Sequence, residues 1–337
     1  MFDWLRRAGQ PEQGQVGVML QGPEGLPEPL RAALEQRLGP TQIWPALADA
    51  RSLREHVRRA RPAALVVFGN PGLPPDLWRD LGVPLYWINA PGACAAPAVA
   101  SCVRSLGAHE ALPHSVLTGD PLLGLPADAM PAEQHRFCDR FQEVRDRQRW
   151  ILYFAESVEP EEDLAYQTFL RLSRRGVGLL VLAPKDPARH ETVYRDAMRF
   201  HLLTNRHRRL MTSYVPHKTR VYYLEDAEAL RDMYGCADVV VAGGSFGRGG
   251  PEGPELVRPL SLLRAVVVGP QAQSALCRAA VADGAIRAVA SEAELESSVA
   301  SLLLDPAARA SLGSFGGAWL EQQRGALSRV LAAVAQW

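Results

Sequence analysis

The sequence predicts an α/β protein built from two Rossmann-like domains in tandem. The length of 337 residues exceeds what one hydrophobic core usually supports, so two domains are expected. Hydrophobic residues make up 47% of the chain, which is enough to fill globular cores. Short apolar runs alternate with helical segments in each half, and this alternation indicates parallel sheets with helices on both faces.

The first domain is expected over residues 1–125 and contains three apolar runs that predict buried strands. Each run ends at a turn signal rich in glycine, proline or asparagine, as strands of a parallel sheet commonly do. The predicted strands are Val16–Leu20, Ala63–Phe68 and Val83–Ile88. The predicted helices are Pro29–Leu38, which closes at Gly39-Pro40, and the basic helix Arg51–Arg61, which stops at Pro62.

Residues 126–149 interrupt this alternation. They contain few β-branched residues and many charged ones, with a helix expected around Glu133. We therefore interpret this stretch as a linker or connecting helix between the two domains.

The second domain is expected over residues 150–320, where the alternation restarts. Glu161, Glu162 and Asp163 stand in the first turn of a predicted helix, where the helix dipole favours carboxylates. The predicted strands are Trp150–Ala155, Gly178–Ala183, Arg220–Leu224, Val239–Ala242 and Ala265–Val268, and the helices are Pro160–Arg175, Pro187–Phe200 and Ala227–Tyr234. Residues 321–337 predict a C-terminal helix that crosses back to the first domain. Two tandem Rossmann-like domains are the layout of the GT-B architecture, in which ligands are expected in the cleft between the domains.

The overall charge and the cysteines exclude several classes of protein. The 37 basic and 37 acidic side chains cancel, which argues against a whole-protein electrostatic grip on nucleic acid. The five cysteines are odd in number and far apart, with no Cys-x-x-Cys pair, so they predict reduced buried thiols of a cytoplasmic protein and no zinc site. No apolar run approaches the roughly 18 residues that cross a bilayer, and no signal peptide opens the chain, so we expect a protein that does not span a membrane.

The stretch from Met233 to Pro270 is the most informative part of the chain. It predicts a strand, a glycine loop, a helix and a second strand, and the loop holds Gly243-Gly244-Ser245 and Gly249-Gly250. Glycines at the carboxyl end of a buried strand let the backbone approach a ligand, and the following helix offers N–H groups to an anion. Two interpretations stay open, a phosphate or nucleotide site and a turn that only permits tight helix–strand packing.

The order of several motifs resembles the 3-deoxy-D-manno-octulosonic acid (Kdo) transferases, which use CMP-Kdo to glycosylate the lipid A precursor. The resemblance covers most of the chain and is strongest after residue 150. The motifs are Tyr234-x-x-Ala237-Asp238, Gly243-Gly244-Ser245, Arg248-Gly249-Gly250, Gly269-Pro270, residues 155–162 and residues 183–189. It implies a GT-B fold, a CMP-sugar donor, no metal or other cofactor, and a place in lipopolysaccharide biosynthesis.

The chain departs from the family where its chemistry would lie. Glu255 stands at the family's asparagine and Arg258 at its glutamate, so a carboxylate that could accept from ribose hydroxyls is replaced by a cation. Lys185 stands where the family has an arginine. Both side chains are positively charged, but lysine is a point charge and cannot bind a phosphate with two parallel hydrogen bonds as arginine does. On the acceptor side, Glu24 is a candidate for the general base, and an exposed loop glutamate without a catalytic role is the other interpretation of it. The segment Gly69–Pro75 lacks the two carboxylates of the family.

The first hypothesis is therefore an active transferase. Metal-independent, inverting transfer of a sugar acid from a CMP-sugar to a lipid-linked or glycan acceptor would use Glu24 as the base and helix dipoles with basic side chains for the leaving nucleotide. The donor-binding residues on this hypothesis are Ser157, Lys185, Arg189, Gly243, Gly244, Ser245, Arg248, Gly249, Gly250 and Glu255. The protein would be cytoplasmic, with peripheral contact to the cytoplasmic face of the inner membrane.

Other hypotheses stay open beside it. One is a catalytically inactive relative that binds a partner protein or a nucleotide, because acidic residues are lost from the acceptor side while the two-domain core persists. Another is an enzyme with a changed donor. The basic stretch from His201 to Arg209 suggests a third possibility, a nucleic-acid binder. A solvated loop or a patch facing anionic lipid fits this stretch as well, and we expect no nucleic-acid partner.

Overall fold

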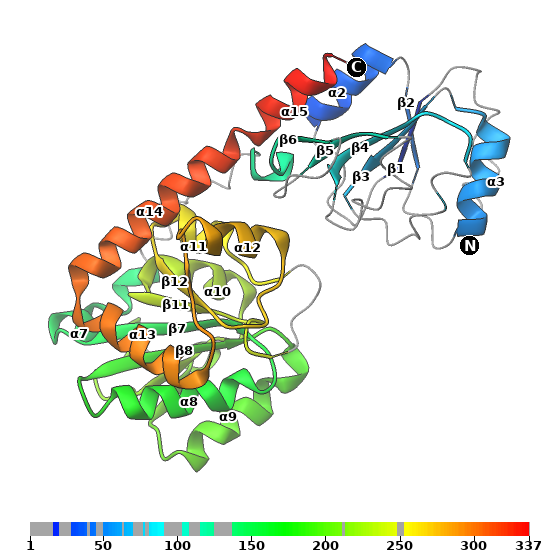
Figure 1. The fold of residues 1–337 in the computed structure, drawn as a ribbon. Coiled ribbons are helices and arrows are strands. Elements are labelled where there is room, and N and C mark those ends of the chain that lie inside the picture. The colour runs from blue at the N-terminus through cyan, green and yellow to red at the C-terminus, as the bar shows by residue number, and fades with distance from the viewer. Residues whose placement is uncertain are drawn as a thin grey trace. The chain divides into compact units, whose positions relative to one another are not determined.

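The computed structural model consists of two compact units, Met1–Leu125 with Gln322–Trp337 and Pro126–Glu321 (Figure 1). Each unit contains one parallel sheet. The residues described are 16–19, 28–38, 41–44, 50–62, 64–69, 77, 81–90, 103–107, 115–124, 137–210, 213–247 and 253–336. Among these, no helix is both long enough and apolar enough to cross a membrane.

The first unit is built on a six-stranded sheet in the order β2-β1-β3-β4-β5-β6. Its strands are β1 (Val16–Met19), β2 (Thr41–Trp44), β3 (Ala64–Phe68), β4 (Leu85–Ala90), β5 (Val103–Gly107) and β6 (Ser115–Leu117). Helices α2 (Glu28–Leu38) and α3 (Ala50–Ala60) and the short η2 (Pro121–Gly124) belong to this unit. Strand β3 is buried along its whole length, which explains its uninterrupted apolar sequence.

The C-terminal helix completes the core of the first unit. Helix α14 (Pro306–Arg324) leads out of the second unit, and α15 (Ala326–Val334) packs against α2 and η2. Val330 and Val334 are fully buried in a cluster with Leu30, Leu34 and Ile88. The Arg329 guanidinium donates from Nε to the Thr118 carbonyl at 2.7 Å. The end of the chain is therefore an integral part of the N-terminal unit.

The second unit is built on a seven-stranded sheet in the order β13-β12-β11-β7-β8-β10-β9. Its strands are β7 (Trp150–Ser157), β8 (Gly178–Pro184), β9 (Thr204–Arg206), β10 (Val221–Tyr223), β11 (Val239–Ala242), β12 (Ala265–Val268) and β13 (Arg287–Ala288). Its helices are α7 (Gln142–Asp146), α8 (Glu161–Leu172), α9 (His190–Arg199), α10 (Ala227–Met233), α11 (Val257–Ser261), α12 (Ala275–Ala282) and α13 (Glu292–Leu304). Short 3-10 turns η3 (Pro187–Arg189), η4 (His207–Arg209) and η5 (Tyr234–Cys236) complete it.

Alternate residues of the central strands fill the two faces of this sheet. Leu152 and Phe154 of β7 join one core cluster, which also contains residues of α8, α9 and α13. Ile151 and Tyr153 join the cluster on the other face, with residues of α10. This period of two, with both faces apolar, is what a parallel strand covered by helices requires.

One sequence-based expectation is wrong in this unit. Cys138 and Cys236, 98 residues apart, form a disulfide, whereas reduced thiols were predicted. Their spacing gave no sign of the pair, because it is tertiary folding that brings the start of the unit beside η5. The stretch 201–209 contains β9 and the turn η4, and within it the side chain of Arg206 is only 10% exposed in ion pairs with Glu191 and Glu225, whereas His201, Arg208 and Arg209 are exposed. Arg206 is therefore committed to the fold.

Candidate functional site

The order of the seven-stranded sheet reverses between β7 and β11. From β7 the chain proceeds to β8 on one side, and from β11 it proceeds to β12 on the other. Ligands of open α/β sheets bind outside the carboxyl ends of the strands at such a reversal. The residues that follow β7 and β11 therefore stand where a ligand of this sheet is expected.

A small pocket lies at this reversal and has room for about one water molecule. Its walls come from the ends of β7, β8 and β11 and from the segment before α11. The lining residues are Glu156, Val158, Lys185, Gly243, Gly244, Gly253 and Pro254. A ligand larger than water would therefore lie across the mouth of this pocket.

The loop after β11 is wrapped around a buried carboxylate of the protein itself. Glu161, the first residue of α8, is only 2% exposed. Its carboxylate accepts hydrogen bonds from the backbone N–H groups of Gly244 at 2.8 Å, Ser245 at 2.8 Å, Phe246 at 2.7 Å and Gly247 at 3.2 Å, and from Val158 at 3.0 Å. These successive amides form the kind of anion-binding nest that often holds a phosphate. In this protein a carboxylate of the chain occupies that nest.

The glycines of the loop are required by this packing. A Cβ on Gly243 would lie 2.1 Å from the Glu156 carbonyl oxygen, and one on Gly247 would lie 2.5 Å from the Glu159 carbonyl oxygen. Gly244 has a φ of 72°, a conformation that other residues rarely adopt. Gly243 was expected to let the backbone approach a ligand. In the structure its backbone lies close to the end of the neighbouring strand β7.

Two of the predicted donor-binding side chains are engaged within the fold. Arg189 forms an ion pair with the buried Glu162 at 3.2 Å and a longer one with Glu159 at 3.7 Å. The Ser157 hydroxyl donates to the same Glu162 carboxylate at 3.4 Å. Burial raises the pKa of Glu162, and the charge of Arg189 opposes that rise. Arg189 thus compensates a buried carboxylate and is not an open phosphate clamp.

Ser245 is engaged in the same way, because its hydroxyl donates to the Ala242 carbonyl and its N–H to Glu161. Glu255 is exposed and accepts from the Arg258 N–H at 2.9 Å. Arg258 itself donates to the Arg231 carbonyl at 3.1 Å and lies 3.9 Å from the Asp232 carboxylate on α10. Four predicted site residues, Glu24, Arg248, Gly249 and Gly250, lie outside the described residues.

Lys185 is the predicted residue that remains exposed at the pocket. It follows β8 directly, and among the described residues its ammonium forms no hydrogen bond or ion pair. Its charge reaches Glu156, whose pKa it lowers against the larger effect of burial. A ligand at the described part of the pocket would therefore meet one positive charge, that of Lys185, close to the carboxyl groups of Glu156 and Glu255.

Glu156 is a site residue that the sequence analysis did not single out. It lies at the end of β7 with a φ of 51°, which is rare for a residue with a side chain. Burial raises its pKa, Lys185 lowers it, Glu255 raises it, and a hydrogen bond with Tyr234 lowers it. A strained, partly buried carboxyl group with a shifted pKa in a pocket is a common sign of a functional site.

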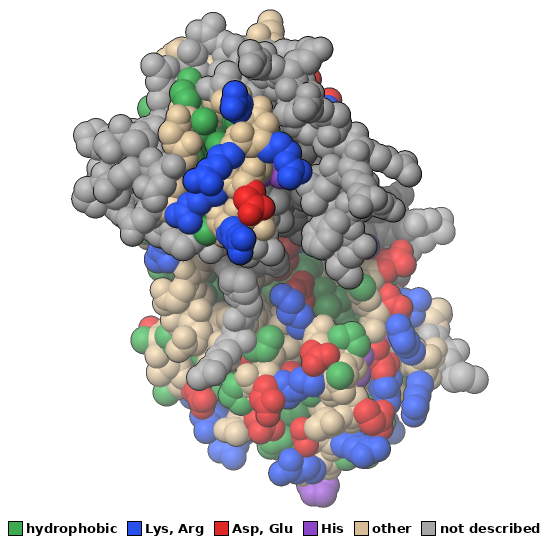
Figure 2. All heavy atoms as spheres, turned by 90° about the vertical axis from the view of Figure 1, so that its right-hand side faces the viewer, with side chains coloured by type: hydrophobic (Ala, Val, Ile, Leu, Met, Phe, Trp, Pro, Cys, Tyr) green, Lys and Arg blue, Asp and Glu red, His purple; other side chains and the backbone are tan. Residues whose placement is uncertain are grey.

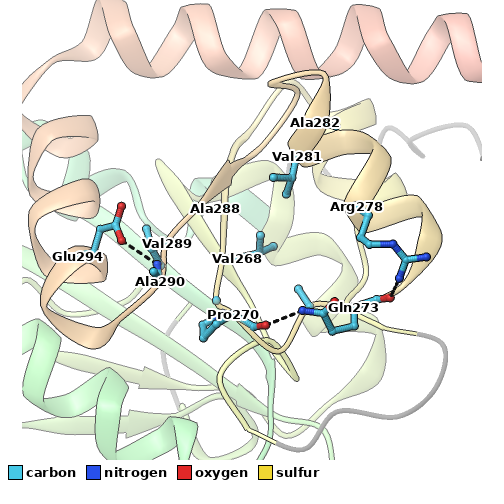
Figure 3. Close-up of a pocket in the computed structure, with 12 residues that line it drawn as sticks. Val268, Pro270, Gln273, Arg278, Val281, Ala282, Ala288, Val289, Ala290 and Glu294 are labelled. Carbon is cyan, nitrogen blue, oxygen red and sulfur yellow. Dashed lines mark hydrogen bonds between the residues drawn. The ribbon is translucent and has the colours of Figure 1, made fainter.

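A second cavity lies beside the carboxyl ends of β12 and β13 and has a volume of about 560 Å³ (Figure 3). Its walls are formed by Val268, Val281, Ala282, Ala288, Val289 and other small residues. The polar side chains at its edge contact the backbone, since Gln273 donates to the Pro270 carbonyl at 2.8 Å and Glu294 accepts from the Ala290 N–H at 2.7 Å (Figure 3). This cavity suits an apolar group more than a phosphate.

Metal ligands are not grouped in the described part of the chain, where no three His, Cys, Asp or Glu side chains lie together as a metal site requires. Among the described residues that line the pocket at the reversal of the sheet, Lys185 is the exposed cation.

Comparisons with known proteins support the fold. No family model and no curated protein matches the chain. Among solved structures it is similar to Anabaena Alr3699/HepE in complex with UDP, with a TM-score of 0.53 and 10% identity over 96% of this chain and 97% of that chain. It is also similar to a putative UDP-N-acetylglucosamine 2-epimerase from Listeria monocytogenes, with a TM-score of 0.52 and 10% identity over 92% of this chain and 94% of that chain.

A third similar structure is the C-terminal CMP-Kdo binding domain of WaaA from Acinetobacter baumannii, with a TM-score of 0.47 and 20% identity over 60% of this chain and 99% of that chain. At these identities the likeness to solved structures concerns the fold. The predicted fold class is confirmed, because the protein has the GT-B type of fold with two Rossmann-like units.

Proposed function

We propose that the protein is a nucleotide-sugar-dependent glycosyltransferase whose donor nucleotide lies over the small pocket at the reversal of the seven-stranded sheet. One observation carries this proposal. Lys185 stands exposed at the carboxyl edge of the sheet, where its order reverses and where open α/β sheets take their ligands. A lysine at that place provides a point charge for a phosphate group.

The donor we propose is a CMP-sugar, and the transferred group is a sugar acid. The motif order around Gly243-Gly244-Ser245 and Gly269-Pro270 supports this choice through its resemblance to Kdo transferases. The charge of the pocket is compatible with it, because a donor with a single phosphate brings less negative charge beside Glu156 and Glu255 than a diphosphate does. The similarity of the fold to that of an Anabaena protein in complex with UDP supports a nucleotide ligand.

The proposed reaction is metal-independent transfer, with inversion, to a lipid-linked or glycan acceptor. Lys185 would stabilise the negative charge that develops on the departing nucleotide. Glu24 is proposed to take the proton from the acceptor hydroxyl, a role that contributes about 10²–10⁴ to the rate in general base catalysis. Glu24→Gln is then expected to abolish transfer while leaving CMP binding unchanged, and unchanged turnover would remove Glu24 from the mechanism.

A second candidate function is a binding module without catalysis. It is favoured because groups that could bind a phosphate already bind carboxylates of the protein. Glu161 accepts the hydrogen bonds of the loop amides, and Glu162 forms an ion pair with Arg189. A site in which these groups already serve the fold retains little to stabilise a leaving phosphate.

Calorimetric titration of the purified protein with CMP, CDP and UDP separates the two candidates. Selective binding of CMP would support the transferase. Binding of CDP or UDP with no CMP binding would reassign the donor. The absence of binding to any of the three would contradict the transferase and favour the binding module.

A further inference from the structure

The Cys138–Cys236 disulfide fastens turn η5 to the segment before α7. Tyr234 and Cys236 belong to this three-residue turn and are only 2% and 1% exposed. The Arg145 side chain on α7 adds a second link, because it donates to the Cys236 carbonyl at 3.1 Å. The disulfide therefore holds in place a turn that carries a buried tyrosine.

Tyr234 connects this turn to the pocket at the reversal of the seven-stranded sheet. Its hydroxyl is hydrogen-bonded to Glu156, and its ring packs edge-on against Tyr153 of β7 with the ring centroids 5.2 Å apart. Glu156 and Lys185 both line the pocket. β11, which leads into the glycine loop of the pocket, begins shortly after η5. Two walls of the pocket therefore depend on where η5 lies.

The Glu156 carboxylate determines how far the charge of Lys185 is available to a ligand. The two groups already interact, since Lys185 lowers the pKa of Glu156. Figure 2 shows acidic and basic side chains mixed over one face of the second unit, so the charges at the pocket itself matter more than a broad field of one sign. A carboxylate that loses the Tyr234 hydroxyl needs another hydrogen-bond donor, and Lys185 is a cation of the same pocket.

We infer that the Cys138–Cys236 disulfide is a redox switch that holds Tyr234 against Glu156 and thereby keeps Lys185 available for an anionic ligand. In the reduced protein, η5 has lost its covalent link to the segment before α7. Tyr234 then leaves Glu156, and the carboxylate pairs with Lys185. The inference deepens the proposed function by adding regulation of the same site, and its nucleotide measurement rests on that function.

An external dithiol supplies the electrons for this switch. One of its thiolates attacks the Cys138 sulfur, since Cys138 is half-buried whereas Cys236 is almost fully buried. The S–S bond of the protein breaks, and the Cys236 sulfur leaves as a thiolate and takes up a proton. The second thiolate of the reductant then attacks the reductant sulfur of the mixed disulfide, which releases Cys138 to become a thiol and leaves the reductant as a disulfide. Two electrons and two protons thus pass to the protein.

The first measurement needs no nucleotide. Hydrogen–deuterium exchange of the full chain is measured with and without dithiothreitol. We expect the amides of residues 155–158 and 243–247 to exchange about fivefold faster after reduction, the effect of losing about one net hydrogen bond that holds the pocket, and those of α13 to change much less. Faster exchange confined to residues around the two cysteines would show that the disulfide only stabilises the fold, and would overturn the inference.

Tyrosine variants test the link through Tyr234. With the disulfide intact, Tyr234→Phe should exchange at residues 155–158 as the reduced wild type does, and dithiothreitol should add little there. The matched control is Tyr166→Phe, which also loses a buried hydroxyl, one that donates to the Val193 carbonyl at 2.8 Å in the other core cluster. It should keep the response of the wild type. A full response in Tyr234→Phe would contradict the role of Tyr234.

The second measurement is calorimetric titration of CMP at about pH 8, well above the ordinary glutamate pKa. Reduction of the wild type should weaken CMP binding about fivefold. Glu156→Gln should bind CMP equally in both redox states, because it has no carboxylate to pair with Lys185. Cys138→Ser should bind as the reduced wild type does and should not respond to dithiothreitol. Circular dichroism should show that each variant is folded.

Three outcomes of the titration have different consequences. Equal CMP affinity of the oxidised and reduced wild type would overturn the inference. A response of Cys138→Ser to dithiothreitol would also overturn it, since another cysteine would then be responsible. No binding of CMP, CDP or UDP by the oxidised protein would contradict the proposed function, and the exchange measurement would then decide the inference by itself.

Discussion

The Glu161 carboxylate accepts a hydrogen bond from the backbone N–H of Ser245 at 2.8 Å, across 84 residues of sequence. The same carboxylate binds the amides of Gly244, Phe246 and Gly247. It therefore joins the start of α8 to the loop after β11, on the two sides of the point where the sheet order reverses. The loop that the sequence predicts as a phosphate cradle is shaped around an anion of the protein itself.

Removal of this carboxylate is expected to destabilise the second unit. In Glu161→Ala, several buried amides lose their acceptor, and each unsatisfied group costs about 1–3 kcal/mol. We expect the free energy of unfolding to fall by at least about 3 kcal/mol in urea denaturation. The matched control is Glu292→Ala, at the exposed first residue of α13, which should change the free energy by less than about 0.5 kcal/mol.

Sulfate or phosphate should then restore part of the stability of Glu161→Ala. The vacated amides would bind a small anion, as nests of successive N–H groups do. A melting temperature that rises with sulfate in Glu161→Ala, and much less in the wild type or Glu292→Ala, is the expected result. An equal rise in all three proteins would show that the amides are not the site of binding.

Glu156 should make stability depend on pH. Burial raises the pKa of its folded-state carboxyl, so the native protein keeps a proton that the unfolded chain has released. Between the ordinary glutamate pKa and the raised one, stability therefore falls as pH rises. Glu156→Gln should remove the contribution of Glu156 to this slope, leave that of Glu162, and be more stable than the wild type above that window, as measured by the urea midpoint between about pH 4 and 8.

The control for this prediction is Glu228→Gln, because Glu228 is exposed on α10. Its curve should run parallel to that of the wild type. A Glu156→Gln curve that is also parallel would contradict the raised pKa. The same variant should lose any increase in CMP affinity at low pH, because a neutral group at position 156 no longer repels the phosphate.

The Cys138–Cys236 disulfide should contribute measurably to stability. It closes a loop across a sequence separation of 98 residues, for which the loss of chain entropy in the unfolded state predicts about 4.7 kcal/mol. Cys138→Ser and the wild type in reductant should both unfold at a lower urea concentration. Reductant should have no effect on Cys138→Ser, and an unchanged midpoint of the reduced wild type would contradict the disulfide.

Local sequence patterns predicted the central strands but not the edges of the sheets. β7, β8, β11 and β12 are buried on both faces, so their apolar runs are visible without tertiary information. The edge strands β9 and β13 have three and two residues and are partly polar, and only pairing with a neighbour identifies them. The Cys138–Cys236 disulfide could not be predicted either, because only the folded structure brings these two distant cysteines together.

For the candidate site, the sequence predicted where the site lies better than it predicted what each side chain does there. The glycines after β11 lie at the reversal of the sheet, as a ligand-binding turn would. Glu161 was expected only to favour the dipole of its helix, because nothing local shows that it meets amides more than 80 residues away. Arg189 could not be assigned to Glu162 either, since their contact depends on how α8 and η3 pack.

The central claim, that a donor nucleotide binds against Lys185, is tested most directly by calorimetric titration of CMP into Lys185→Gln. Lys218 is the other lysine of the chain and is exposed, so Lys218→Gln is the matched control. We predict that Lys185→Gln weakens CMP binding about tenfold or more, the loss expected for one charge-assisted contact, while Lys218→Gln binds as the wild type does. Equal CMP affinity in the two variants and the wild type would contradict the claim.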